Sequence, residues 1–157
     1  MEFVLAREDD LEIISSLYKK AIGSVGCTWS EEYPSKEHTL GDLKRGDLFC
    51  LKTENGEIIG AISVDDDKQV ENLPCWSENG AELARLVVKE DYQNQGIAGK
   101  LLKEAMEVLK ERGYDYIHFL VSKHHTKALR AYEKLQFQNV GESDLYAGDW
   151  WCYEKKL

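Results

Sequence analysis

The chain has 157 residues, of which 43% are hydrophobic and 31% are charged, with a formal net charge of −9. This length and composition suit one folded globular domain with a substantial core. The acidic balance argues against a nucleic-acid partner, because phosphate backbones bind clustered Lys and Arg, whereas it suits a cationic substrate such as an amine.

The N-terminus and the cysteines argue against further classes of protein. The first residues lack the basic and then apolar layout of a secretory signal, and no apolar stretch approaches the length needed to cross a membrane, so we expect a cytoplasmic protein. The four cysteines are scattered without paired C-x-x-C spacing: Cys27, Cys50, Cys75 and Cys152. We therefore expect reduced, partly buried thiols and no metal site.

The first half of the chain predicts three strands and two helices. Apolar residues recur at helical spacing from Asp9 onward, and Gly23 and Gly26 end that helix. Ser35 begins a second helix that closes near Gly46. Strands are predicted at residues 3–6, 47–53 and 58–64, the last two joined by an Asn-Gly turn.

The second half predicts a central strand between helices and further strands. Residues 65–80 are predicted as a loop, followed by the strand at 82–89, a helix at 96–112, a strand at 116–121, a helix at 126–136, and strands at 137–140 and 150–153. The chain contains no repeats and no plausible linker. We therefore predict a single domain of mixed α/β type, with hairpins before the central strand.

The helix that follows the central strand begins with small residues. Gly96 and Gly99 let the backbone come close to a ligand, and the first turn of a helix has free amide groups and a partial positive charge. This end of the helix therefore suits an anion such as a phosphate. A second interpretation stays open, in which the glycines only permit a tight turn from strand to helix.

Two motifs in the right order carry a family resemblance. The first is Gln93-Asn94-Gln95-Gly96-Ile97-Ala98, five residues after Val88, and the second is Ala128-Leu129-Arg130-Ala131-Tyr132 leading to Phe137. The chain resembles the GCN5-related N-acetyltransferase (GNAT) superfamily over nearly its whole length. The resemblance implies one GNAT domain over residues 1–157, with a mixed, mostly antiparallel sheet flanked by helices and a splayed central strand pair.

The resemblance also implies acetyl-CoA as the acetyl donor, without a metal. Backbone groups of Leu86 and Val88 would pair with its pantetheine arm, and the Leu86 amide would face the thioester oxygen. Backbone of the turn and first helical residues would hold the pyrophosphate: Gln93, Asn94, Gln95, Gly96, Ile97, Ala98, Gly99 and Lys100. His125 stands where many relatives carry an Asn that contacts the cofactor.

Two residues are predicted to move protons. Tyr132 lies at the position of the family's general acid, and a phenol can protonate the leaving thiolate; alternatively it is a core aromatic. Glu82 lies four residues before Leu86, where several relatives place a base, and an attacking amine must be neutral. The alternative for Glu82 is a solvated strand end.

Two aromatic segments are candidates for the acceptor side. Trp29, Glu31, Glu32 and Tyr33 combine aromatic rings and carboxylates, which can hold a cationic amine, although an ordinary surface loop is equally open. The closing segment, residues 145–153, is also aromatic. Core packing against the last helix is its simplest explanation, ahead of an acceptor pocket or a homodimer seam.

We therefore predict an N-acetyltransferase that moves the acetyl group of acetyl-CoA to a primary amine by direct attack in a ternary complex. The acceptor is a small molecule or a peptide, and the sequence does not choose between them. The alternative is a non-catalytic acyl-CoA-binding sensor, and a third interpretation is an interaction module.

One departure from the family is Gln136, a non-glycine at a helix end that often turns left-handed.

Overall fold

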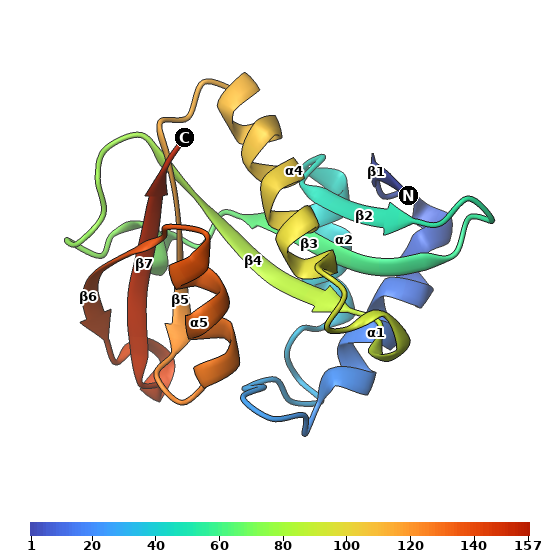
Figure 1. Cartoon of the computed structure of the whole chain (residues 1–157), viewed down its shortest axis with the longest axis horizontal. Coiled ribbons are helices and arrows are strands. Elements are labelled where there is room, and N and C mark those ends of the chain that lie inside the picture. The colour runs from blue at the N-terminus through green and yellow to red at the C-terminus, as the bar shows by residue number, and fades with distance from the viewer. The chain divides into compact units, whose positions relative to one another are not determined.

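The computed structural model describes residues 1–157 and contains a seven-stranded sheet flanked by helices (Figure 1). The strands are β1 (Glu2–Leu5), β2 (Leu48–Lys52), β3 (Ile58–Asp65), β4 (Gly80–Val88), β5 (Tyr116–Ser122), β6 (Gln138–Ser143) and β7 (Trp150–Lys156). The helices are α1 (Leu11–Ala21), α2 (Lys36–Lys44), α3 (Lys68–Glu71), α4 (Ile97–Glu111) and α5 (Thr126–Lys134).

The strand order is β1-β2-β3-β4-β5-β7-β6. Strand β4 pairs with β5 in parallel, through Gly80–Glu82 and Tyr116–His118, whereas β1 with β2, β2 with β3, and β7 with β5 and β6 are antiparallel. The predicted fold class, a mixed and mostly antiparallel sheet flanked by helices, is therefore confirmed. No helix is both long and apolar enough to span a bilayer.

The chain divides into two compact units. The first unit comprises Met1–Val64 and Ala84–Ala105, and the second comprises Asp65–Leu83 and Met106–Leu157. Strand β4 and helix α4 contribute residues to both.

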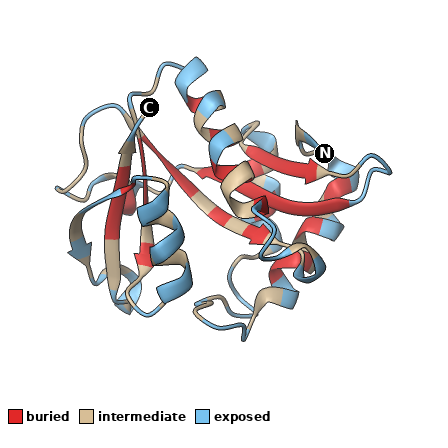
Figure 2. Cartoon of the chain, viewed as in Figure 1, coloured by how far each residue is buried: buried red, intermediate tan, exposed pale blue.

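In the first unit, helices cover both faces of strand β3. Gly60 faces α4, since a Cβ atom there would lie 2.8 Å from Leu101 Cδ1. Ala61 belongs to a hydrophobic cluster with Ile14 and Tyr18 of α1. Neighbouring residues of a strand point to opposite faces, so α1 and α4 lie on opposite sides of the sheet. Figure 2 shows the resulting burial along β2 and β3.

In the second unit, the two faces of β5 differ in chemistry. Phe119 contacts the ring of Tyr132 on α5, with centroids 4.6 Å apart. The preceding residue, His118, is 1% exposed and stacks on Trp76 at 4.4 Å. The apolar face is therefore covered by α5, and the opposite face by the segment that precedes β4.

Sequence patterning identified every strand and every α-helix except α3. This helix has four residues, too few to show a helical period, and begins where Asp67 Oδ1 accepts a hydrogen bond from the Gln69 amide at 2.9 Å. The predicted left-handed end of the last helix is confirmed, because Gln136 has φ +66°. The four cysteines are free thiols, as expected.

Candidate active site

A left-handed residue interrupts strand β4 immediately before Leu86. Arg85 has φ +52°, a region that costs a non-glycine residue about 1–2 kcal/mol. Its guanidinium donates two hydrogen bonds to Asp42 of α2, from Nε to Oδ2 at 2.9 Å and from Nη2 to Oδ1 at 2.8 Å. Both side chains are 1% exposed. A buried, bidentate ion pair therefore stabilises the left-handed backbone conformation of Arg85.

Sequence reasoning missed this pair. Asp42 and Arg85 are 43 positions apart and lie on different elements, so no local spacing relates them. The available signal was a charged residue, Arg85, inside the otherwise apolar run of residues 83–88. A buried arginine requires an acidic partner, but the sequence does not say which one.

The glycine turn, residues 93–100, comprises the end of the β4–α4 connection and the first residues of α4. Asn94 has φ +61° and Gly96 has φ +78°, so the chain needs left-handed conformations here. Gly99 differs, because its φ is ordinary and a Cβ atom added there would meet nothing within 4 Å. Gly96 is explained by backbone conformation, whereas packing within the chain does not explain Gly99.

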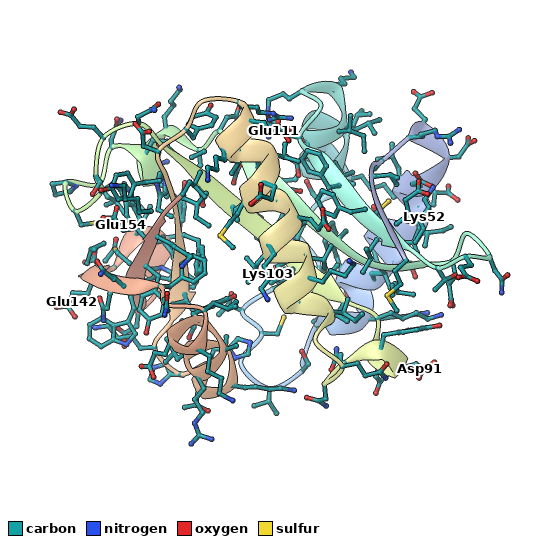
Figure 3. All side chains as sticks on the ribbon, turned by 45° about the horizontal axis from the view of Figure 1, so that its top comes forward. Lys52, Asp91, Lys103, Glu111, Glu142 and Glu154 are labelled. Atoms are coloured by element: carbon teal, nitrogen blue, oxygen red, sulfur yellow. The ribbon has the colours of Figure 1, made fainter.

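Side chains of the first unit hold the start of this turn. Glu57, next to the β2–β3 hairpin turn, accepts hydrogen bonds from Lys89 Nζ at 2.5 Å and from the Tyr92 hydroxyl at 2.9 Å. Gln93 Nε2 donates to the Val88 carbonyl at 3.1 Å. Figure 3 labels Asp91, just before the turn, and Lys103, further along α4.

Lys100, whose backbone the family resemblance assigns to the pyrophosphate, lies on the surface of α4. Its side chain is 42% exposed and its Nζ is 3.7 Å from Glu104 Oε1, one helical turn later. It is therefore accessible and only weakly paired.

The predicted acceptor residues occupy different environments. Trp29 is half-buried and packs edge-on against Tyr18, with centroids 5.3 Å apart. Glu31 and Glu32 are exposed. The Tyr33 hydroxyl accepts a hydrogen bond from Arg85 Nη1 at 3.1 Å, which joins this loop to the interrupted part of β4.

Tyr132, the predicted general acid, belongs to the second unit. Its ring contacts Phe119 at 4.6 Å and Phe137 at 5.8 Å. Burial raises the pKa of the Tyr132 phenol to about 12, so the hydroxyl keeps its proton throughout the neutral range. The environment therefore suits a core aromatic, and the hydroxyl is protonated, as a proton donor must be.

Glu82, the predicted base, is buried and 7% exposed, so its interpretation as a solvated strand end is wrong. It pairs in register with His118, whose Nε2 lies 2.9 Å from Glu71 Oε1. His118 in turn pairs in register with Glu154, which is 6% exposed. A row of ionisable side chains therefore crosses one face of the second unit.

His125 caps α5. Its Nδ1 accepts a hydrogen bond from the Ala128 amide at 3.3 Å, and burial lowers the pKa of the ring. The neighbouring His124 is 81% exposed, with Nε2 3.6 Å from Asp149 Oδ2. Sequence reasoning did not identify the cap, because Ser, Thr, Asp and Asn are the usual residues there.

The closing aromatic segment is partly core. Tyr153 packs against Phe119 at 6.4 Å and Tyr132 at 6.2 Å, as the core interpretation expects. Trp151 instead lies under Lys123 Nζ, 4.1 Å from the ring centroid. Tyr146 is 59% exposed and donates to Asp67 Oδ2 at 2.6 Å.

Comparison with known proteins shows to which family the chain belongs. The model of the Acetyltransferase (GNAT) family matches residues 13–137, from α1 to the end of the second motif. The chain belongs to the GNAT family. The predicted family and the prediction of an acetyl-CoA-dependent acetyltransferase are thereby confirmed.

Individual relatives agree with this membership. The GNAT chain is 26% identical to an acetyltransferase of Pectobacterium atrosepticum over 89% of both chains. It is 26% identical to human N-acetyltransferase 8B over 88% of its own length, which spans 49% of that longer protein. It resembles the solved PaiA N-acetyltransferase of Thermoplasma acidophilum, in complex with coenzyme A, with a TM-score of 0.74, 24% identity, and coverage of 99% and 98%.

The GNAT chain contains no group of three or more His, Cys, Asp or Glu side chains arranged to hold a metal ion.

Proposed function

We propose that this GNAT chain transfers the acetyl group of acetyl-CoA to a primary amine of a small molecule or peptide, by direct attack within a ternary complex. The observation that carries the proposal is the absence of a side chain at Gly99, in the first turn of α4. Gly99 has no strained φ and a Cβ atom there would meet nothing within 4 Å, so the backbone of this turn is open to the close approach of a ligand.

The residues of the first unit fit the donor. The free amides of the α4 N-terminus and the left-handed turn at Asn94 and Gly96 suit a diphosphate by charge and geometry. Leu86 and Val88 would supply backbone partners for the pantetheine arm beside a splayed edge of β4. The Val88 carbonyl already accepts from Gln93, but a carbonyl oxygen has a second lone pair to offer.

The reaction requires two proton transfers and one oxyanion donor. The amine nitrogen forms a bond to the thioester carbonyl carbon while the carbon–sulfur bond breaks, and the Leu86 amide stabilises the negative charge on the carbonyl oxygen. Glu82 accepts the proton that the amine loses, and Tyr132 donates a proton to the departing thiolate. Burial only raises the pKa of Tyr132, so the phenol is protonated at neutral pH.

The acceptor is proposed to be a cationic amine. Glu31 and Glu32 carry exposed carboxylates next to Tyr33, and the whole chain has a net charge of −9. Trp29 would contribute through a face of its ring. His125 would contact the donor through the Nε2 atom that its helix-capping contact leaves free.

A thiol-release assay with acetyl-CoA across a panel of amines tests the proposal. We expect thiol release with at least one amine, and slower release from Tyr132→Phe at unchanged thermal stability. Tyr114→Phe, in the turn before β5, is the matched control and should behave like the wild type. Stabilisation by coenzyme A without thiol release from any amine would favour the acyl-CoA sensor, and no stabilisation would favour the interaction module.

A further inference from the structure

We propose that Asp42, Arg85 and Tyr33 form a positioning network that sets the direction of the Leu86 amide and holds the acceptor loop. This inference rests on the proposed function. It assigns roles to Asp42 and Arg85, which no motif in the chain identifies. All of the residues lie in the first unit.

The Asp42 carboxylate is fixed from two sides. Arg85 approaches both carboxylate oxygens, and Arg45 Nη2 donates to Oδ1 at 2.8 Å. Arg45 also donates to the Val64 carbonyl at 3.0 Å and to Asp47 Oδ2 at 3.3 Å. Asp42 is thus a fixed anchor on α2 for the side chain of Arg85.

The anchored side chain determines the backbone at the reaction centre. The peptide unit that joins Arg85 to Leu86 is planar and rigid, so the backbone angles of Arg85 decide where the Leu86 N–H points. A left-handed arginine inside a strand is unfavourable without compensation, and its buried ion pair supplies that compensation. Without the pair, the strand would relax toward extended geometry and turn the Leu86 amide.

Tyr33 extends the network to the acceptor loop. The Ser30 amide donates to the Tyr33 carbonyl at 3.0 Å, and the Tyr33 amide donates to the Ser30 carbonyl at 3.2 Å, which closes a tight turn with Glu31 and Glu32 at its tip. The Tyr33 hydroxyl attaches this turn to Arg85. Its side chain is 38% exposed, so it lies at the accessible end of a chain of contacts that begins in the core.

Two substitutions separate the two roles. Tyr33→Phe removes only the hydroxyl, and we expect it to raise the KM for the amine by roughly tenfold or less, the loss of about one hydrogen bond, with a smaller effect on kcat. Arg85→Lys keeps the charge but cannot bond both oxygens of Asp42, so we expect a kcat at least about tenfold lower with little change in the dissociation constant of coenzyme A.

The controls distinguish positioning from stability. Tyr114→Phe should match the wild type in both kinetic constants. Thermal unfolding of each variant shows which are folded at the assay temperature; if Arg85→Lys is not, Tyr33→Phe decides the proposal. An unchanged KM for the amine in Tyr33→Phe, or an unchanged kcat in folded Arg85→Lys, would overturn it.

Absence of acetyl transfer by the wild type with every amine would instead overturn the proposed function. The network is then judged by the NMR resonance of the Leu86 amide. We expect Arg85→Lys to shift that resonance and Tyr114→Phe to leave it in place. An unshifted Leu86 resonance in Arg85→Lys would refute the positioning role independently of activity.

Discussion

Gly99 occupies a helical position where glycine is unfavourable and alanine would fit. The space around its Cα is open and its φ is ordinary. Glycine lowers helix stability by up to about 1 kcal/mol relative to alanine, so Gly99→Ala should raise the free energy of unfolding by several tenths of a kcal/mol. The same methyl group would obstruct a diphosphate at the α4 N-terminus, and we expect the dissociation constant of coenzyme A to rise about tenfold or more.

Gly41→Ala in α2 is the matched control for this prediction. An added Cβ there would lie 3.6 Å from Arg45 Nη1, an ordinary contact. It should stabilise the protein similarly without affecting coenzyme A binding, as measured by denaturant unfolding and calorimetry. Equal affinities of Gly99→Ala and the wild type for coenzyme A would contradict a ligand-facing role for Gly99.

The helix cap at His125 predicts a pH dependence of stability. Burial lowers the pKa of His125 in the folded state, so the unfolded chain binds a proton more readily. The capping contribution is therefore present above the unfolded pKa, about 6.5, and is lost as the pH falls toward the folded pKa. Protonation of Nδ1 would also remove the acceptor of the Ala128 amide.

His125→Asn should remove part of this pH dependence, because asparagine caps helices well and does not titrate. We expect the difference in unfolding free energy between pH 7.5 and pH 5.5 to shrink relative to the wild type, in urea titrations. His124→Asn, on the exposed neighbour, is the control and should retain most of that difference. A pH dependence identical to the wild type in His125→Asn would rule out the capping explanation.

At the scale of elements, the close packing of α4 against strand β3 depends on Gly60. A Cβ atom there would lie 2.8 Å from Leu101 Cδ1 and 3.0 Å from the Val87 carbonyl. Gly60→Ala should therefore lower the free energy of unfolding by about 1–3 kcal/mol through overpacking, and weaken coenzyme A binding by displacing α4. Gly41→Ala serves as the control, and a stability equal to the wild type would show that α4 can move without loss.

At the end of α5, a substitution is expected to raise the free energy of unfolding instead of lowering it. Gln136 adopts φ +66°, where glycine carries no steric penalty. Gln136→Gly should raise the free energy of unfolding by up to about 1 kcal/mol, offset in part by the greater freedom of glycine in the unfolded chain. Thermal unfolding measures the effect, and Gln138→Gly in the adjacent strand should destabilise instead.

At the scale of the whole molecule, the net charge of −9 should favour multiply charged amines. Added salt shortens the Debye length from about 10 Å at 0.1 M to about 3 Å at 1 M and so weakens the attraction. We expect kcat/KM for a multiply charged amine to fall more steeply with KCl than for an amine with one charge. Equal slopes for the two amines would show that the overall charge plays no part in acceptor choice.

The order of elements could be predicted from the sequence alone because helices and strands impose local hydrophobic periods. The glycine turn was identified from its small residues, and the left-handed Gln136 from the family motif from which it departs. Both depend on residues that are adjacent in the chain. The short helix α3 was missed because four residues are too few to display a period.

Only the tertiary structure revealed which distant side chains meet. The Asp42–Arg85 pair, the close approach of α4 to Gly60, and the burial of Glu82 beside His118 each join separate elements. None of these contacts leaves a periodic trace in the sequence, because its partners are fixed by packing and register rather than by spacing along the chain. The sequence by itself determined the family and the position of the glycine turn, whereas folding decided which side chains hold the strand beside that turn.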